Sequence, residues 1–298
     1  MESKPTEDLS SSLSAASVKV LVYDHGEQPD NSQIMLSVAD GSSRTFHVPE
    51  MRNYMFMPTS CGLVLLVDDT DSLQTSLWNP QTGEKIALPA MEKALPDQSY
   101  VIGLHELPAT HPDSHLPPTK ITINGMAAVQ GKFYFHKSRD VVGVLSFARD
   151  PEPHFEMAEF DAPMPSFVSH LPQKVIMPYL MESSGELFLV CLFFHGCTLE
   201  HVAEVNAYRM DFAKKEWCKV TDIGDKAFLL GPGSFAASCS AMEHGLKRGC
   251  VYFAYDFLGD SNDYHIFDLA EGTRELARPT QDMPVLSCKP FWLVPVVP

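Results

Sequence analysis

The chain has 298 residues, of which 45% are hydrophobic, and a formal net charge of −16 at pH 7. That apolar content excludes a wholly disordered chain. The charge argues against a nucleic-acid partner, because phosphate contacts need clustered Lys and Arg, and it favours a basic protein partner instead.

The cysteines and the apolar runs of the sequence indicate the cellular location of the protein. The seven cysteines include no C-x-x-C pair, and several lie inside apolar strands, which is typical of a reducing compartment. The longest strongly apolar run, residues 187–194, is far shorter than the ~20 residues of a membrane helix. We therefore expect a protein of the cytoplasm, the nucleus or both, with no membrane partner.

The N-terminal residues 1–17 are Ser-rich and lack the basic start and apolar core of a signal peptide. We expect them to form a disordered tail and residues 18–298 to form one domain.

In chain order, the domain is a series of short strands separated by turn residues. Alternating or apolar runs bounded by Gly, Pro, Asn and Asp predict strands, and helical spacing is weak throughout. The strands fall into five clusters, centred near residues 20–48, 61–89, 123–160, 178–220 and 234–279. Residues 94–120 have the weakest secondary-structure pattern, with a strand-like YVIGLHELP followed by a proline-rich loop.

One pattern of strand, polar turn, strand and closing proline recurs at residues 32–49, 76–89 and 264–279. A variant over 203–231 has its turn at Asp211 to Lys215 and a glycine-marked exit. A repeated hairpin unit of this kind predicts an all-β fold, a single β-propeller of about five to six blades. The terminal FWLVPVV would supply the fourth strand of the first blade and close the ring.

Six pieces of the sequence together resemble the plant F-box-associated β-propeller domain of the KIB type, long listed as a domain of unknown function. The pieces are LWNPQTGEKIALP, NGMAAVQGKFYF, ESSGELFLV, YRMDFAKKEWCKVTDIGDKAFLLG, SFAASCSAMEHGLKRGCVYFAYD and FDLAEG. They run in the family's order over residues 32–295, and Trp217 to Gly231 is the most specific. The resemblance implies a role beside ubiquitin-ligase substrate receptors.

Two departures from the family pattern qualify that role. Many members carry an F-box of ~40–50 residues ahead of the propeller, whereas the 17 residues here are too few for helices that need a buried apolar face. We therefore expect a form without an F-box, stand-alone or decoy. The loop at 105–120 stands where relatives have further strands, so one blade is expected to be abbreviated or lost.

Three acidic loops are the candidate partner-binding face, because the hairpin tips of aligned blades would share one end of a propeller. They contain Asp24, Glu27 and Asp30; Asp68, Asp69 and Asp71; and Asp256, Asp260 and Asp263. The alternative is that these tips are simply solvated and carry Asp for its turn geometry. A calcium site at DFLGDSND is not expected, because the ordered D-x-D-x-D-G spacing is missing.

Two groups of residues could supply metal ligands, and both also suit ordinary structural roles. They are His105, His111 and His115 in one loop, and His195, Cys197 and His201 in another. The His111 to His115 spacing suits zinc only on a helix, which Pro112 makes improbable, and the second group lacks paired ligands. We expect no metal and no cofactor.

Catalytic motifs are also missing: there is no G-x-S-x-G and no G-x-G-x-x-G. Gly125 to Lys132 predicts a hairpin and not a nucleotide loop. Glycoside hydrolysis would need paired carboxylates on inner strands, and only Glu182 and Glu186 come near one.

The tryptophans, Trp78, Trp217 and Trp292, are read as packing residues, although exposed ones would suit a sugar. The sequence thus predicts a monomeric, non-enzymatic protein-interaction module. The alternatives are a small-molecule or carbohydrate-binding propeller and a glycoside-hydrolase-like enzyme.

Overall fold

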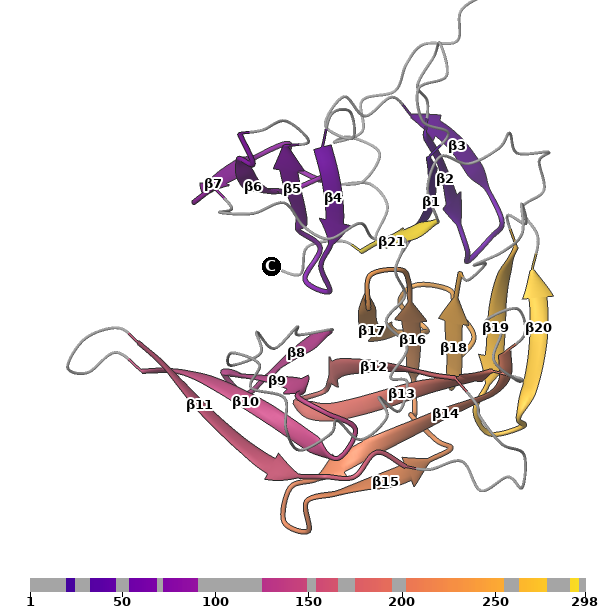
Figure 1. Ribbon diagram of the computed structural model, residues 1–298. Coiled ribbons are helices and arrows are strands. Elements are labelled where there is room, and N and C mark those ends of the chain that lie inside the picture. The colour runs from indigo at the N-terminus through magenta and orange to yellow at the C-terminus, as the bar shows by residue number, and fades with distance from the viewer. Residues whose placement is uncertain are drawn as a thin grey trace, which may run out of the picture. The chain divides into compact units, whose positions relative to one another are not determined.

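The computed structural model describes residues 20–24, 33–46, 54–68, 72–90, 125–148, 154–165, 175–194, 202–254, 263–277 and 290–294. Within these ranges the chain forms twenty-one strands, β1 to β21, and no helix (Figure 1). The strands make five separate sheets. The predicted all-β class and the five strand clusters are therefore confirmed.

The chain divides into two compact units. One unit, here called the split unit, comprises residues 1–99 and 223–298, and the other, the central unit, comprises residues 100–222. The split unit holds three of the sheets and the central unit holds two.

The terminal sheet of the split unit joins the two ends of the domain. Its strands, in the order β21-β1-β2-β3, are Phe291–Leu293, Val20–Asp24, Gln33–Ser37 and Ser43–Phe46. The pairing of β21 with β1 is antiparallel and aligns Leu21 with Trp292. The expectation that the terminal FWL strand completes the first blade is thereby confirmed.

The second sheet is a four-stranded antiparallel meander. Its strands β4 to β7 are Tyr54–Pro58, Val64–Asp68, Thr75–Trp78 and Lys85–Leu88. Sequence reading started this cluster at residue 61 and missed β4, because YMFMP has no period-two alternation and ends in a proline. Pairing with β5, which sets Tyr54 opposite Asp68, makes it a strand.

The fifth sheet has one strand more than the others. In the order β17-β16-β18-β19-β20, its strands are Ala236–Ser240, Lys226–Leu230, Cys250–Phe253, Tyr264–Asp268 and Thr273–Ala277. β16 pairs antiparallel with β17 but parallel with β18. Sequence reading left residues 226–230 outside the five clusters, because a parallel partner cannot be read from a local hairpin pattern.

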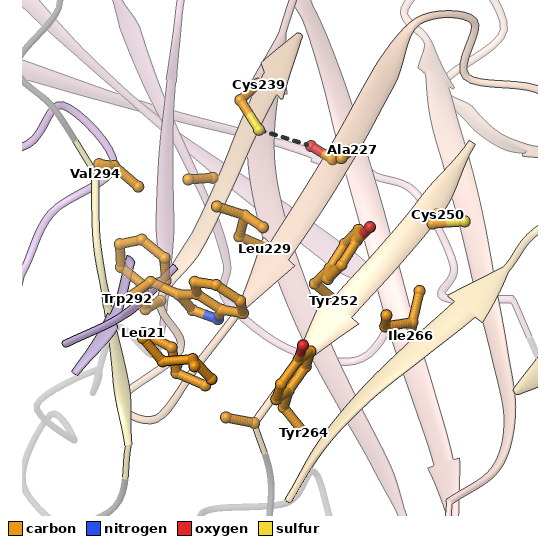
Figure 2. Packing of buried hydrophobic residues seen from close by; sticks show 14 of the residues in the cluster. Leu21, Ala227, Leu229, Cys239, Cys250, Tyr252, Tyr264, Ile266, Trp292 and Val294 are labelled. Carbon is orange, nitrogen blue, oxygen red and sulfur yellow. Dashed lines mark hydrogen bonds between the residues drawn. The ribbon is translucent and has the colours of Figure 1, made fainter. Parts of the chain in front are cut away.

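The terminal sheet lies between the fifth sheet and the second sheet of the split unit, and each of its two faces carries apolar side chains. One face packs on the fifth sheet through Leu21, Leu36 and Trp292, which lie with Tyr252 and Ile266 in one buried cluster (Figure 2). The other face packs on the second sheet in a cluster that contains Val22, Met35, Val64, Leu66, Trp78, Phe291 and Leu293. Alternation along each strand supplies both faces, as the period of two requires.

The central unit consists of two antiparallel meanders. The third sheet contains β8 to β11, which are Met126–Val129, Lys132–His136, Val141–Ala148 and His154–Asp161. The fourth contains β12 to β15, which are Ile176–Ser183, Glu186–Phe194, Val202–Asp211 and Glu216–Val220. The two sheets share a buried core that includes Val142, Leu189, Cys191 and Tyr208.

A five-residue turn recurs in the outermost hairpins of several sheets. In β6–β7 and β19–β20, the N–H of Gly83 and of Gly272 donates to the carbonyl four residues earlier, that of Asn79 and of Asp268. Both glycines have positive φ, +74° and +66°. In β14–β15 the corresponding position is Lys215, with φ +59°. This turn is the physical basis of the repeat that the sequence shows.

Candidate functional site

The acidic loops are described only in part. Asp68 and Asp263 have described side chains, and Asp24 has a described backbone that pairs with Gln33. Asp68 ends β5, and Asp263 immediately precedes β19 on another sheet. The other members of the candidate face, which are Glu27, Asp30, Asp69, Asp71, Asp256 and Asp260, lie outside the described residues. The shared acidic face stays a prediction.

The β5–β6 loop has a defined shape at its described end. The hydroxyl of Ser72 donates to Oδ2 of Asp68 over 2.9 Å, and the Asp68 N–H donates to the carbonyl of Gln74 over 2.9 Å. Leu73 has φ +47°, a region that a branched side chain rarely occupies. The carboxylate of Asp68 is therefore held at the base of the loop by local contacts.

Two of the three acidic loops occupy the same connection in neighbouring sheets. The β1–β2 loop and the β5–β6 loop each join the second and third strands, counted from β21 and from β4. β21 contacts β4, so these two sheets lie side by side in the split unit. The third loop joins β18 and β19, which are third and fourth in the five-stranded order.

The two carboxylates considered for glycoside hydrolysis belong to the β12–β13 hairpin. Oε1 of Glu182 accepts a hydrogen bond from the Gly185 N–H over 2.6 Å, and Glu186 forms an ion pair with Arg209 at 3.4 Å. Glu182 and Glu186 are exposed and flank the turn at Ser184, which confirms the predicted turn. Each carboxylate has a structural partner within its own sheet.

No group of three or more His, Cys, Asp or Glu side chains within the described ranges could hold a metal ion. The histidines singled out in the sequence, His105, His111, His115, His195 and His201, lie outside these ranges, as does Cys197. The segment from Gly125 to Lys132 leads from β8 through a tight turn into β9, which confirms the predicted hairpin. No described helix is long and apolar enough to span a membrane.

The tryptophans differ in how their indole N–H groups are satisfied. Trp292 is fully buried and donates from Nε1 to the carbonyl of Leu230 over 2.8 Å. Trp78 is also buried, yet its Nε1 finds no hydrogen-bond acceptor among the described residues. Trp217 is half-buried with its Nε1 covered and likewise unsatisfied within that part of the chain. Trp78 and Trp292 pack in the core, as predicted.

Sequence reasoning missed His136, a buried histidine at the end of β9. Neither ring nitrogen has a hydrogen-bond partner in the described structure, and burial lowers the pKa of His136 to about 4. The ring lies 6.2 Å from that of Trp217, centroid to centroid. In KFYFHK it reads as one more member of an apolar strand, so only its unsatisfied nitrogens single it out.

The outer strand of the third sheet was also missed as a surface. β11 is the edge strand next to β10 and is exposed along most of its length. Its Met157 is 61% exposed and lies in one cross-strand row with Leu145 and Phe133. The sequence HFEMAEFD gives no sign of which strand of a meander will be outermost, so this edge could not be found before the pairing was known.

Five sheets, antiparallel except for the β16–β18 pair, with β1 and β21 paired in one of them, define a β-propeller of five blades. The family model of the KIB1-4 β-propeller matches residues 35–268. The chain therefore belongs to the KIB1-4 β-propeller family, as the sequence resemblance indicated. No curated protein matches the chain.

Solved structures resemble the chain only distantly. Catalytically inactive H270A virginiamycin B lyase from Staphylococcus aureus with quinupristin is 11% identical, with a TM-score of 0.35 over 88% of this chain and 85% of that one. Apo AztD from Citrobacter koseri is 9% identical, with a TM-score of 0.34 over 92% and 96%. The N-terminal domain of Nup159 is 13% identical, with a TM-score of 0.26 over 89% and 63%. Scores this low add nothing on function.

Proposed function

We propose that this chain is a non-enzymatic protein-interaction module of the cytoplasm or nucleus, acting as a monomer, whose acidic loops bind a basic partner. The observation that carries the proposal is the repetition of acidic residues at one structural position. The β1–β2 and β5–β6 loops occupy the same connection in adjacent sheets, and both carry several carboxylates. With a net charge of −16, long-range attraction also favours a basic partner.

Family membership supports an interaction role, because the KIB-type resemblance implies propellers that work beside ubiquitin-ligase substrate receptors. A partner bound by the loops could thus be a substrate of such a ligase, or be shielded from one. The glycoside-hydrolase-like and sugar-binding alternatives gain no support from the described carboxylates and tryptophans, since Glu182 and Glu186 have structural partners and Trp78 and Trp292 are buried.

The test is affinity capture from plant-cell extract with the wild type and with the triple variant Asp68→Lys, Asp69→Lys and Asp71→Lys. We expect a basic protein to be enriched by the wild type and lost from the variant. Cullin-adaptor subunits in the same fraction would place the partner beside a ubiquitin ligase.

A matched control makes the same change of charge elsewhere. Glu84→Lys, Glu243→Lys and Glu271→Lys alter exposed acidic residues of other turns. Partner binding that survives in this control but not in the loop variant assigns the site to the β5–β6 loop. If both triple variants lose the partner equally, the net charge of the protein, and not the β5–β6 loop, is responsible for binding. If the wild type captures no partner from the extract, the proposed function is wrong.

A further inference from the structure

The edge formed by β11 is longer than the other outer edges of the sheets. β11 has eight residues, whereas the outer strands β3 and β7 have four each, and β15 and β20 have five each. All eight residues pair with β10 in unbroken register from His154 to Asp161. The strand contains no proline and no bulge, two of the features with which proteins blunt such an edge, and relies on charged side chains instead.

The side chains along this edge combine exposed apolar surface with negative charge. On one face Met157 is followed by Glu159 and Asp161, since alternate residues of a strand share a face. On the other face Glu156 is exposed. The strand has three carboxylates and no Lys or Arg of its own. Glu159 pairs with Lys137, which follows β9, and Glu156 lies 3.6 Å from Nε2 of His154 on the same strand.

The backbone of an edge strand presents a row of N–H and C=O groups on its open side, and within the described ranges no strand pairs with that side of β11. A second copy of this chain is a poor occupant. Pairing two β11 strands edge to edge would bring three carboxylates of each copy together along one short edge, and this accumulation of like charge disfavours the pairing. The same residues favour a strand that carries Lys or Arg.

We propose that the β11 edge accepts an extended basic segment of a partner protein by strand addition. The incoming strand adds a fifth strand to the third sheet, so main-chain hydrogen bonds supply affinity and side-chain pairs supply specificity. In antiparallel pairing it places basic residues opposite Asp161 and Glu159 and an apolar residue opposite Met157. The segment that fits therefore reads basic-x-basic-x-apolar. This inference rests on the proposed function and refines it, by naming a second surface and the form of the bound segment.

The probe is a fluorescein-labelled peptide with the central sequence Lys-Thr-Lys-Thr-Val, flanked by Thr residues. Its matched control has the same composition with the two Lys residues adjacent, which breaks the alternation. Fluorescence anisotropy with the intact chain measures the Kd of each, and amide hydrogen exchange reports whether residues 154–161 gain protection. We expect the alternating peptide to bind at least tenfold more tightly and to slow exchange in β11.

Variants then assign the binding to this edge. Met157→Lys and Asp161→Lys each should raise the Kd at least tenfold. Met242→Lys, at a residue 80% exposed in the turn after β17, should leave the Kd unchanged. Circular dichroism checks that the variants are folded. Equal affinity for the two peptides, no added protection in β11, or no binding up to about 1 mM, which corresponds to only ~4 kcal/mol, would each overturn the proposal.

The β11 variants also separate this inference from the proposed function. In the capture experiment, a partner that is retained by Met157→Lys but lost by the β5–β6 loop variant leaves the interaction module standing and removes the edge. A partner that is lost from both the Met157→Lys variant and the β5–β6 loop variant contacts two surfaces, and this outcome supports the edge proposal.

Discussion

The indole N–H of Trp292, on β21, donates a hydrogen bond to the carbonyl oxygen of Leu230, on β16, over 2.8 Å. This bond links β21, in the terminal sheet, to the fifth sheet. Both residues are fully buried. Trp78 is buried on the second sheet to a similar degree, but its Nε1 has no acceptor in the described structure. The two tryptophans therefore allow the worth of one buried hydrogen bond to be measured.

We expect Trp292→Phe to lower the free energy of unfolding by about 2–4 kcal/mol. It removes the buried hydrogen bond to the Leu230 carbonyl, which contributes about 1 kcal/mol, and part of a large apolar ring, which contributes the rest. Trp78→Phe removes a donor that is already unsatisfied, so its loss should be about 1–2 kcal/mol smaller. Chemical denaturation of both variants checks the difference. Equal losses would show that ring packing alone matters at Trp292.

Local turn chemistry was the most predictable part of the fold. Oδ1 of Asp211 accepts from the N–H groups of Ala213 and Lys214, and Oδ1 of Asp268 accepts from those of Ala270 and Glu271. These bonds span two or three residues, so the residue types themselves indicate the turn. β4 and β16 were missed because long-range pairing, and not local pattern, makes them strands.

Some of the candidate sites could likewise be predicted from local sequence, whereas others depend on long-range strand pairing. The acidic loops could be found from composition, because a run such as Asp68, Asp69 and Asp71 between two strands is visible in one dimension. The buried, unsatisfied ring of His136 and the long edge of β11 could not, because each depends on which strands are neighbours. A sequence pattern shows which residues alternate, but not which strand lies at the end of a sheet.

His136 should make the stability of the protein depend on pH. Its pKa is about 4 in the folded protein, lowered by burial, against an ordinary value of 6.5. The unfolded state therefore takes up the proton first as pH falls. The stability that the neutral ring allows is fully present above pH 6.5 and is lost as pH falls toward 4. The expected loss over this window is roughly 3 kcal/mol, at about 1.4 kcal/mol per unit.

The measurement is chemical denaturation between pH 7 and pH 4, compared with His136→Leu, which has no titrating group. The variant should lose much less stability over this range. His154→Gln alters an exposed imidazole of the same sheet and should retain the full pH dependence of the wild type. Parallel curves for wild type and His136→Leu would show that the histidine is protonated without opening the fold.

Lys215→Gly should stabilise the β14–β15 hairpin. Lys215 has φ +59°, the left-handed conformation that costs an L-residue roughly 1–2 kcal/mol, and glycine adopts it freely. Glycine also loses more backbone entropy on folding, so the net gain should be about 0.5–1 kcal/mol. Thermal unfolding should show a raised Tm.

The reciprocal control is Gly83→Lys, at the same turn position in β6–β7. Gly83 has φ +74° and no atom within 4 Å of the position of an added Cβ, so any loss of stability comes from the backbone conformation alone. Opposite changes of similar size at the two sites support the shared turn. No gain from Lys215→Gly together with no loss from Gly83→Lys would mean that φ at this position costs little.

Gly143→Ala tests a close contact inside the third sheet. Gly143 on β10 is the cross-strand partner of Phe135 on β9, and an added Cβ would overlap the Cζ, Cε1 and Cε2 atoms of that buried ring. We expect a loss of about 1–3 kcal/mol from overpacking. Phe135→Leu removes the ring atoms in question, so in that background Gly143→Ala should cost much less. A double-mutant cycle by chemical denaturation measures this coupling. Additive losses would show that the ring moves aside freely and that glycine is not required beneath it.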